Sequence, residues 1–280
     1  MKPVEIEQRD GDADTPMTTL SDIKSLVIDM DGVLYRGNEA LPGLPEFFRF
    51  LRGSGIGFRL ATNNSGSTPT QYAAKVCKMG GDAAPEEIIT SGTATAAWLA
   101  ERLPPGTRVH VFGEDSLRAA LTERGFVLAD ADVKAVVASI DWGVNFEKLK
   151  RACLLIRGGA MFVATNLDPT RPTEEGLVPG TGALIAAIAA GAETQPVAIG
   201  KPEPTMFEQA MVAMGARPES TATLGDRVDT DMIGGARAGL KTIMVLSGST
   251  GRDEAEAYGP DLIFEDIAAL TQAWRAALAG

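Results

Sequence analysis

The chain has 280 residues, of which 45% are hydrophobic, and this length suffices for one large domain or for two smaller domains with separate cores. Its formal net charge of −11, with no long run of lysine or arginine, argues against nucleic acid and anionic membrane surfaces as partners. Residues 1–20 are polar and acidic, which predicts a flexible N-terminal tail and no secretory signal. No window approaches the ~20 apolar residues that cross a bilayer, so no membrane-spanning segment is expected.

Two cysteines and one histidine narrow the chemistry further. Cys77 and Cys153 lie far apart in helix-like segments, which favours free thiols over a disulfide. Free thiols are typical of a reducing compartment, so we expect a cytoplasmic location. His110 lies in a strand-like run, and we expect it to be an ordinary strand residue. A single histidine excludes a multi-histidine zinc site and leaves a Ser-His-Asp triad without support.

Short apolar runs recur along the chain, each followed by a turn rich in Gly, Asp or Asn and then by an amphipathic segment. In chain order these runs cover residues 25–30, 57–63, 108–113, 134–140, 161–166, 196–200, 221–226, 241–246 and 261–264. Strands that are apolar on both faces, with helices between them, predict an α/β fold with a mostly parallel sheet. Ligands of such sheets bind at the carboxyl ends of the strands, so polar residues there are the first candidates for function.

The segments between these runs have the spacing of helices with one apolar face. Such faces are formed by Leu44, Phe47, Phe48 and Leu51, and by Met206, Ala210, Met211 and Met214. In the last predicted helix, Leu270 and Trp274 are expected to pack against the rest of the domain. We interpret these apolar residues as parts of a core and not as a cofactor site.

The nine strands can be arranged in one sheet, but two sheets are easier to cover with the available helices. The strands between residues 107 and 165 form a group with helices of their own. Connections rich in proline or glycine near 103–106 and 191–196 are natural boundaries. We therefore predict one domain from residues 21–100 and 195–280, and a second α/β domain inserted at 101–194.

The first apolar run ends in two aspartates, Asp29 and Asp31, followed by Gly32. Side chains two residues apart in an extended segment point to the same side, so the two carboxylates face one region. Their mutual repulsion is relieved by a cation, and Mg²⁺ prefers a few carboxylates, water and a substrate phosphate. On its own, the same pattern also occurs in aspartate-rich surface turns.

Three other predicted strands end in polar residues. The run at 57–63 continues into the neutral donors of residues 62–65 (TNNS), and the run at 196–200 is followed by Lys201. The run at 221–226 ends in Asp226, and residues 229–231 (DTD) begin the next helix. Each cluster alone has a structural explanation as a turn, a helix cap or a solvated surface. Four such clusters after four apolar strands make a common functional site the better interpretation.

These residues resemble the motifs of the haloacid dehalogenase (HAD) superfamily. DMDGVLY is similar to its first motif, ATNNS to the second, the lysine of GKP to the third and GDRVDTDM to the fourth, in the same order after residue 20. The strings ITSGTATAAWL, FVATNLDP, VPGTGALIAAI and GGARAGLKTIMVLSG resemble the subgroup with a large α/β cap, type IIA. That subgroup includes p-nitrophenyl phosphatase-like, phosphoglycolate, pyridoxal phosphate and nucleotide phosphatases. The resemblance implies a Rossmann-like catalytic core with an inserted cap that determines substrate specificity.

The resemblance also implies a Mg²⁺-dependent phosphatase that hydrolyses small phosphate monoesters through an aspartyl-phosphate. Asp29 is then the nucleophile, and Asp31 protonates the leaving alcohol and later activates water. The implied metal ligands are the side chains of Asp29 and Asp226 and the main-chain carbonyl of Asp31. Asp231 is implied as an outer partner. Thr62, Asn63, Asn64 and Lys201 are the implied phosphate-binding residues.

The cap loop that begins at residue 165 is the implied reader of the substrate. Its candidates are Asn166, Asp168, Arg171 and Glu174, and Arg171 is suited to a second anionic group of the substrate. Each of them is equally compatible with a solvated loop position.

Two other functions remain open at this point. A phosphotransferase or phosphomutase shares the aspartyl-phosphate but excludes water, and a non-catalytic phosphometabolite-binding protein shares the fold. The expected partner is a small phosphorylated metabolite. Proteins of the subgroup are often homodimers, although no feature of this sequence fixes the oligomeric state or the physiological substrate.

Overall fold

The structure is a computed structural model, and it describes residues 19–173 and 175–279. The predicted tail at 1–20 therefore lies almost entirely outside the described residues. The chain forms two compact units: the described residues of unit 1 are 19–61, 70–88 and 207–279, and those of unit 2 are 62–69, 89–173 and 175–206. Among the described residues, no helix combines the length and apolar character that crossing a membrane requires.

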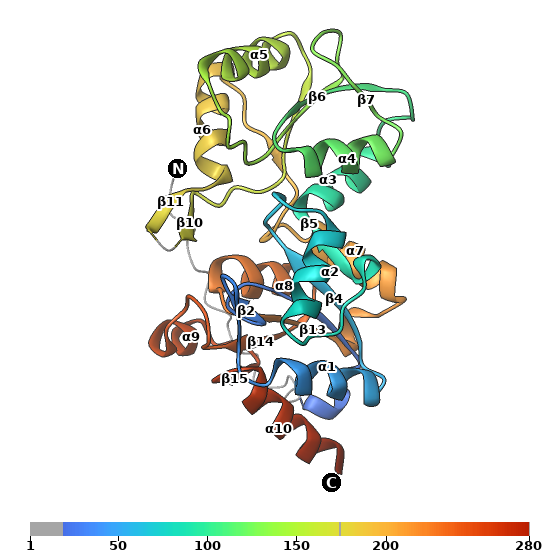
Figure 1. Cartoon of the computed structure of the whole chain (residues 1–280), viewed down its shortest axis with the longest axis vertical. Helices are drawn as coiled ribbons and strands as arrows, with labels where there is room; N and C mark the ends of the chain where they lie inside the picture. Colours follow the sequence, from blue (N-terminus) through green and yellow to red (C-terminus); the bar gives the residue numbers. More distant parts are fainter. Residues whose placement is uncertain (1–18, 174, 280) are drawn as a thin grey trace. The chain divides into compact units, whose positions relative to one another are not determined.

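A six-stranded sheet with the order β15-β14-β13-β1-β4-β5 organises unit 1 (Figure 1). Its neighbouring strands from β15 to β4 run parallel. The strands are β1 (Ser25–Ile28), β4 (Gly57–Thr62), β5 (Ile88–Thr90), β13 (Thr221–Gly225), β14 (Lys241–Val245) and β15 (Leu262–Phe264). Every residue of β1 and β13 is buried, as expected for central strands covered on both faces.

The helices of this part of the chain are α1 (Leu44–Gly53), α2 (Pro69–Lys78), α7 (Thr205–Met214), α8 (Ile233–Arg237), α9 (Arg252–Tyr258) and α10 (Ile267–Ala279). Short helical turns are η1 (Leu20–Asp22), η2 (Pro85–Glu87), η3 (Pro218–Ser220) and η4 (Val228–Met232), and β2 (Tyr35–Arg36) pairs with β3 (Glu39–Ala40) in a small hairpin. Helix α1 begins with Pro45 in its first turn, where the missing N–H costs no intrahelical bond. Its predicted apolar face is buried, and α10 packs against it with Leu270 and Trp274 fully buried.

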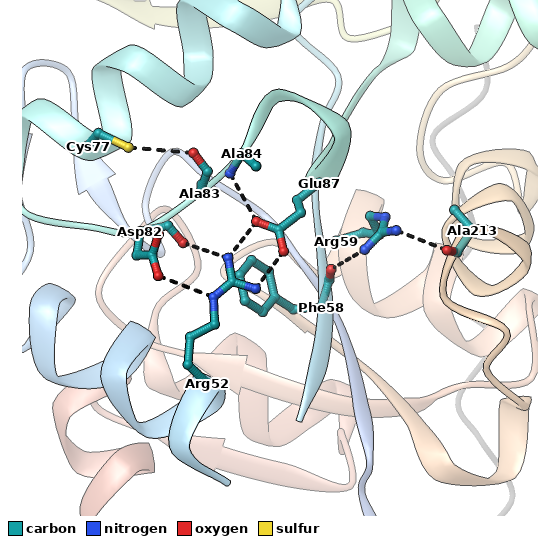
Figure 2. Close-up of polar contacts among 9 residues, drawn as sticks. All are labelled: Arg52, Phe58, Arg59, Cys77, Asp82, Ala83, Ala84, Glu87 and Ala213. Carbon is teal, nitrogen blue, oxygen red and sulfur yellow. Dashed lines mark hydrogen bonds and ion pairs between the residues drawn. The ribbon is translucent and has the colours of Figure 1, made fainter. Parts of the chain in front are cut away.

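A polar cluster at the edge of this core joins α1 to the segment before β5 (Figure 2). The Arg52 guanidinium donates to both carboxylate oxygens of Glu87 at 2.6 Å and to Asp82 at 3.2 Å, and it lies 4.5 Å from the Phe58 ring centre. Burial raises the pKa of Glu87, but bonds from Arg52 and from the Ala84 N–H lower it by more, so the net shift is downward. The cluster therefore fixes the connection between α2 and β5 to the core.

A five-stranded parallel sheet with the order β12-β9-β8-β6-β7 organises unit 2. The strands are β6 (Arg108–Phe112), β7 (Val127–Leu128), β8 (Ala135–Ala138), β9 (Met161–Ala164) and β12 (Val197–Ala198), and the antiparallel hairpin is β10 (Thr170–Thr173) with β11 (Gly176–Pro179). The helices are α3 (Ser91–Ala100), α4 (Asp115–Glu123), α5 (Phe146–Arg157) and α6 (Thr181–Ala192). Helices α5 and α6 pack together (Figure 1), and Ile156 and Ile188 lie in one core with Phe162 of β9.

Side chains at the first residues fix where two of these helices begin. Thr90 and Thr93 exchange backbone and side-chain hydrogen bonds at the start of α3, at 3.0 and 3.1 Å. The Asn145 side chain accepts from the Lys148 N–H at 3.1 Å at the start of α5. Both caps satisfy backbone donors that a helix leaves open.

The structure confirms the α/β fold with mostly parallel sheets, and all nine predicted strands are present. It also contains β2, β3, β5, β7, β10 and β11 in its described part, which the sequence analysis did not predict. These strands have two to four residues, too few for a clear alternation of apolar side chains.

The strand at Val197–Ala198 pairs with β9, so it belongs to the sheet of unit 2 although it lies beyond the boundary predicted at 195. Residues 62–69 and 89–100 also fall in unit 2. A division at residues 100 and 195 into core and inserted domain remains a prediction.

Both cysteines are free thiols, as predicted. His110 is a buried strand residue whose Nδ1 lies 3.0 Å from an Asp130 oxygen and 3.3 Å from the Ala129 carbonyl. It has the structural role that its position in a strand predicts.

Candidate active site

Three carboxylates converge at the carboxyl ends of two neighbouring strands in unit 1. Asp29 follows β1 and Asp226 follows β13, and these parallel strands are paired through Ile28 and Leu224. The Asp29 N–H donates to the Leu224 carbonyl at 2.8 Å, which extends the pairing to the first aspartate. Asp231 lies in η4, and one carboxylate oxygen from each of the three aspartates lies within 4.8 Å of the others.

The cluster has the composition of a site for a hard divalent cation. Asp226 and Asp231 are each 1% exposed, and Asp29 is half-buried. Three acidic groups so close together and so little hydrated repel one another strongly. Carboxylate oxygens are the ligands that Mg²⁺ takes, with water and substrate completing its shell. The residues present therefore fit a metal ion, and Asp29, Asp226 and Asp231 are the side chains that would hold it.

Two glycines allow the backbone to approach the Asp226 carboxylate. Gly32 has φ +88°, and a Cβ at this position would lie 2.5 Å from Asp226 Oδ2. A Cβ at Gly248 would overlap the same carboxylate. Neither position accommodates a side chain without moving the acid.

Asp31 lies two residues beyond Asp29, and its side chain is exposed and outside the carboxylate cluster. Nearby, the Lys75 ammonium lies 3.9 Å from the centre of the buried Tyr35 ring. Burial raises the pKa of Tyr35 well above its usual range, and the charges of Asp31 and Asp29 add to this shift. An exposed carboxylate beside the cluster is compatible with proton transfer, and this role of Asp31 remains a prediction.

The four predicted phosphate-binding residues all lie in unit 2. Asn63 Nδ2 donates to the Lys201 carbonyl at 2.8 Å, so the second and third motifs are directly connected. Thr62 Oγ1 accepts from the Asn64 N–H at 3.1 Å, and Asn64 itself is exposed. Lys201 is only 3% exposed. The arrangement holds these loops in a fixed conformation, while their binding of phosphate remains a prediction.

The cap-loop candidates separate into two kinds. Asn166 Nδ2 donates to the Asn63 carbonyl at 2.8 Å, and Asp168 Oδ2 accepts from Asn63 Nδ2 at 3.0 Å. Both therefore support the loop that contains Asn63. Arg171 lies 5.1 Å from the centre of the Trp142 ring, on the hairpin that follows. Glu174 lies outside the described residues.

The contacts that surround Asp226 come from a segment outside the four sequence motifs. The Ser249 N–H donates to Asp226 Oδ2 at 2.7 Å, and the Thr250 N–H donates to the Asp226 carbonyl at 3.2 Å. The sequence features that mark this segment are the string GGARAGLKTIMVLSG, which ends at Gly248, and the run of small residues 247–250 (SGST) shortly after β14. A run of small residues after a buried strand at the carboxyl edge of a parallel sheet indicates a close backbone approach.

Comparison with known proteins places the chain in a family. A family model described as haloacid dehalogenase-like hydrolase matches residues 26–127, and one described as HAD-hydrolase-like matches residues 198–270. Dihydroxyacetone phosphatase of Corynebacterium glutamicum is 40% identical over 252 residues, which cover 89% of this chain and 91% of that protein.

Solved structures agree with this assignment. A 4-nitrophenylphosphatase from Thermotoga maritima is 33% identical with a TM-score of 0.86, over 90% of this chain and 98% of that one. Glycerol phosphate phosphatase from Mycobacterium tuberculosis, in complex with magnesium, is 32% identical with a TM-score of 0.83, over 92% of this chain and 80% of that one. The carboxylate cluster, the fold and this similarity along nearly the whole chain identify it as a member of the haloacid dehalogenase-like hydrolases and as a phosphatase among them.

Proposed function

We propose that the protein hydrolyses small phosphate monoesters with Mg²⁺ as its metal, through an aspartyl-phosphate on Asp29. The observation that carries this proposal is the cluster of Asp29, Asp226 and Asp231 at the carboxyl ends of β1 and β13 and in η4. Asp29 is the least buried of the three, which favours it over the other two acids as the group that meets a substrate.

In the proposed reaction, a carboxylate oxygen of Asp29 attacks phosphorus and the bond to the leaving oxygen breaks. Asp31 donates a proton to that oxygen, and the exposure of its side chain leaves it free to reach the leaving group. The same carboxylate then accepts a proton from water as water attacks the phosphoaspartate, which restores Asp29 and releases phosphate.

The metal, when bound, offsets the repulsion between the Asp29 carboxylate and the anionic phosphoryl group. Asp29, Asp226 and Asp231 are the proposed side-chain ligands, with the main-chain carbonyl of Asp31 as a fourth protein ligand. We propose that the phosphoryl oxygens are bound by Lys201, Thr62, Asn63 and Asn64, because these residues lie in the second and third sequence motifs. The Asn63 side chain donates to the Lys201 carbonyl, which connects the two loops that contain these residues.

Three-carbon phosphates are the first substrates to test. Two of the similar proteins are named for dihydroxyacetone phosphate and glycerol phosphate chemistry, which supports a small polyol or keto alcohol as the leaving group. Arg171, whose guanidinium lies over the Trp142 ring, offers a positive charge to substrates that have a second anionic group. A carboxylate-bearing substrate would therefore lose rate in Arg171→Met more than dihydroxyacetone phosphate does.

The test is phosphate release by the purified protein with p-nitrophenyl phosphate, dihydroxyacetone phosphate, glycerol phosphates, phosphoglycolate, pyridoxal phosphate, sugar phosphates and nucleoside monophosphates. We expect turnover that requires Mg²⁺, is abolished by EDTA and returns when Mg²⁺ is restored. No release from any of these substrates would overturn the proposal. Transfer to an added alcohol in excess of release to water would replace it with a phosphotransferase.

Cytoplasmic location and a homodimer are also proposed. The two free thiols support a reducing compartment. The exposed apolar side chains Trp142, Phe146 and Leu177 of unit 2 are suited to burial in a subunit contact. Light scattering of the purified protein distinguishes monomer from dimer, and a monomer at micromolar concentration would reject the dimer.

A further inference from the structure

The segment after β14 contacts the carboxylate of Asp226, a proposed metal ligand, and lies outside the four sequence motifs. Its Ser249 N–H donates to Asp226 Oδ2 at 2.7 Å, and the main chain at Gly248 lies so close to this carboxylate that it excludes a side chain. This backbone therefore fixes the position of one oxygen of Asp226. Residues 247–249 are called the Asp226 loop below.

The Asp226 loop is itself bonded to the loop that contains the nucleophile. Ser247 Oγ donates to the Gly32 carbonyl at 2.7 Å. Gly32 lies three residues beyond Asp29, and its main chain also approaches Asp226. A single hydroxyl thus links the main chain after β14 to the main chain after β1.

Arg36 bonds to the main-chain carbonyl of Ser247. Its Nε donates to the Ser247 carbonyl at 2.7 Å, and its Nη2 donates to the same oxygen. Arg36 is in strand β2 of the small hairpin that follows the nucleophile, four residues after Gly32. A hydrogen bond from a charged donor is stronger than one between neutral groups, so Arg36 restrains the main chain of the Asp226 loop.

We propose that Ser247, assisted by Arg36, is a positioning residue for the metal site: it fixes the Asp226 loop against Gly32 and thereby orients the Asp226 carboxylate toward Asp29 and Asp231. Neither residue is a proposed ligand of the metal or of the substrate. The physical reason is preorganisation, because three repelling carboxylates hold the geometry that a cation needs only when the main chain around them is fixed. The inference rests on the proposed metal site, but not on any particular substrate.

Direct measurement of Mg²⁺ binding by calorimetry tests the proposal without substrate. Loss of partners that orient a metal ligand typically costs 10–100-fold in affinity, so we expect Ser247→Ala to raise the Kd for Mg²⁺ about 10-fold. Ser247→Thr keeps the hydroxyl and is expected to bind Mg²⁺ within about twofold of the unchanged protein. Arg36→Met, which leaves the Ser247 hydroxyl in place, is expected to raise the Kd by a smaller factor, about threefold.

Ser220→Ala is the matched control, because Ser220 is also half-buried and donates its hydroxyl to a main-chain carbonyl, that of Arg217. It lies directly before β13, at the end of the strand away from Asp226. We expect this variant to keep the Mg²⁺ affinity of the unchanged protein. Far-ultraviolet circular dichroism without metal establishes that each variant is folded.

The outcomes separate this inference from the proposed function. Ser247→Ala with an unchanged Kd, or equal losses in Ser247→Ala and Ser220→Ala, would overturn the positioning role while leaving the phosphatase intact. Failure of Ser247→Thr to recover the affinity that Ser247→Ala loses would also overturn it. Absence of Mg²⁺ binding by the unchanged protein would overturn the proposed metal site and this inference together.

Discussion

The two parallel sheets of this chain differ in the chemistry of their carboxyl ends. In unit 1, the central strands β1 and β13 are followed by the acids Asp29 and Asp226. In unit 2, the central strands β8 and β9 are followed by the neutral residues Ser139 and Thr165. Both sheets are covered by helices and buried at their centres, so the architecture alone does not distinguish a catalytic sheet from a structural one.

The neutral edge satisfies its own hydrogen-bonding groups. Thr165 Oγ1 donates to Ser139 Oγ at 2.8 Å, and Ser139 and Ser65 share a further hydroxyl–hydroxyl bond. The acidic edge contains negative charges that a cation stabilises. The difference between the edges is therefore one of charge: the neutral hydroxyls bond to one another, whereas the clustered carboxylates fit a cation. Substitutions at the two edges should therefore fail in different ways.

The largest effect is expected from Asp29→Asn. The amide has nearly the size of the carboxylate but does not attack phosphorus, so kcat should fall by about 10⁴-fold or more. Circular dichroism should remain that of the unchanged protein, and no phosphorylated enzyme should be trapped by acid quench with labelled substrate. Retention of more than about a tenth of the activity would exclude Asp29 as the nucleophile.

Gly248→Ala should produce the next largest effect. A methyl group there overlaps the Asp226 carboxylate, so the acid or the Asp226 loop must move. We expect Mg²⁺ affinity to fall by about 100-fold and stability by about 1–3 kcal/mol. Gly251→Ala is the matched control, because no atom lies within 4 Å of the added methyl and the backbone has φ −78°. Equal Mg²⁺ affinities in the two variants would contradict the close approach.

The sequence predicts the acids of the site because strand-end carboxylates are local features. Asp29 and Asp226 each follow a recognisable apolar run, and the parallel arrangement of the strands requires that neighbouring ends meet at one edge. Asp231 is predicted as an outer partner of the metal, and η4 brings one of its carboxylate oxygens within 4.8 Å of those of Asp29 and Asp226, while its role remains a prediction. The sequence VDTDM does not predict that this helical segment begins with a wider, π-helical turn.

The supporting contacts are less predictable because they depend on distant main-chain atoms. Ser247 donates to the main-chain carbonyl of Gly32, 215 positions away. Every residue has such a carbonyl, so the residue type does not indicate which one accepts the bond. Asn63 shows the same limit: its sequence context does not predict that it donates to the Lys201 carbonyl and to Asp168, while its binding of phosphate remains a prediction. The strand at Val197–Ala198 is correctly predicted as a strand, but its sheet is decided by pairing with β9.

At the neutral edge, Ser139→Ala should reduce stability without changing the Mg²⁺ affinity. The buried hydroxyls of Ser65 and Thr165 lose a partner, which costs about 1–3 kcal/mol. Chemical denaturation and calorimetry give the two quantities separately. Thr122→Ala is the control, because its hydroxyl is exposed and donates within helix α4 to Arg118. A weaker Mg²⁺ affinity in Ser139→Ala would contradict the division of roles between the two edges.

Arg52→Met tests the structural part of unit 1, away from the acidic edge. Its ion pairs with Glu87 and Asp82 are partly exposed, so the loss should be no more than about 1 kcal/mol. Arg49→Met on the same helix is the control, because Arg49 and its partner Glu46 are both largely exposed and should contribute almost nothing. Unfolding by urea compares the two variants. An equal loss in both would show that the cluster of Figure 2 adds no more than a surface pair.

The smallest effect is a pH dependence of unit 2 that depends on His110. Burial lowers the pKa of this imidazole, and the Ala129 carbonyl and Asp130 offset only part of the shift. A folded-state pKa below the unfolded value of 6.5 means that the unfolded chain binds the proton more readily. His110 therefore contributes stability that is present above pH 6.5 and is lost as the pH falls through the folded pKa. The size of this loss follows from the difference between the folded and the unfolded pKa.

Because His110 is the only histidine, its NMR signal gives the folded pKa without assignment. Comparison with His110→Gln isolates the effect on stability: between pH 7.5 and 5.5 the unchanged protein should lose more stability than the variant does. A measured pKa above 6.5 would reverse the sign, and stability would then fall as the pH rises. In that case the negative charge of Asp130 would outweigh burial at His110.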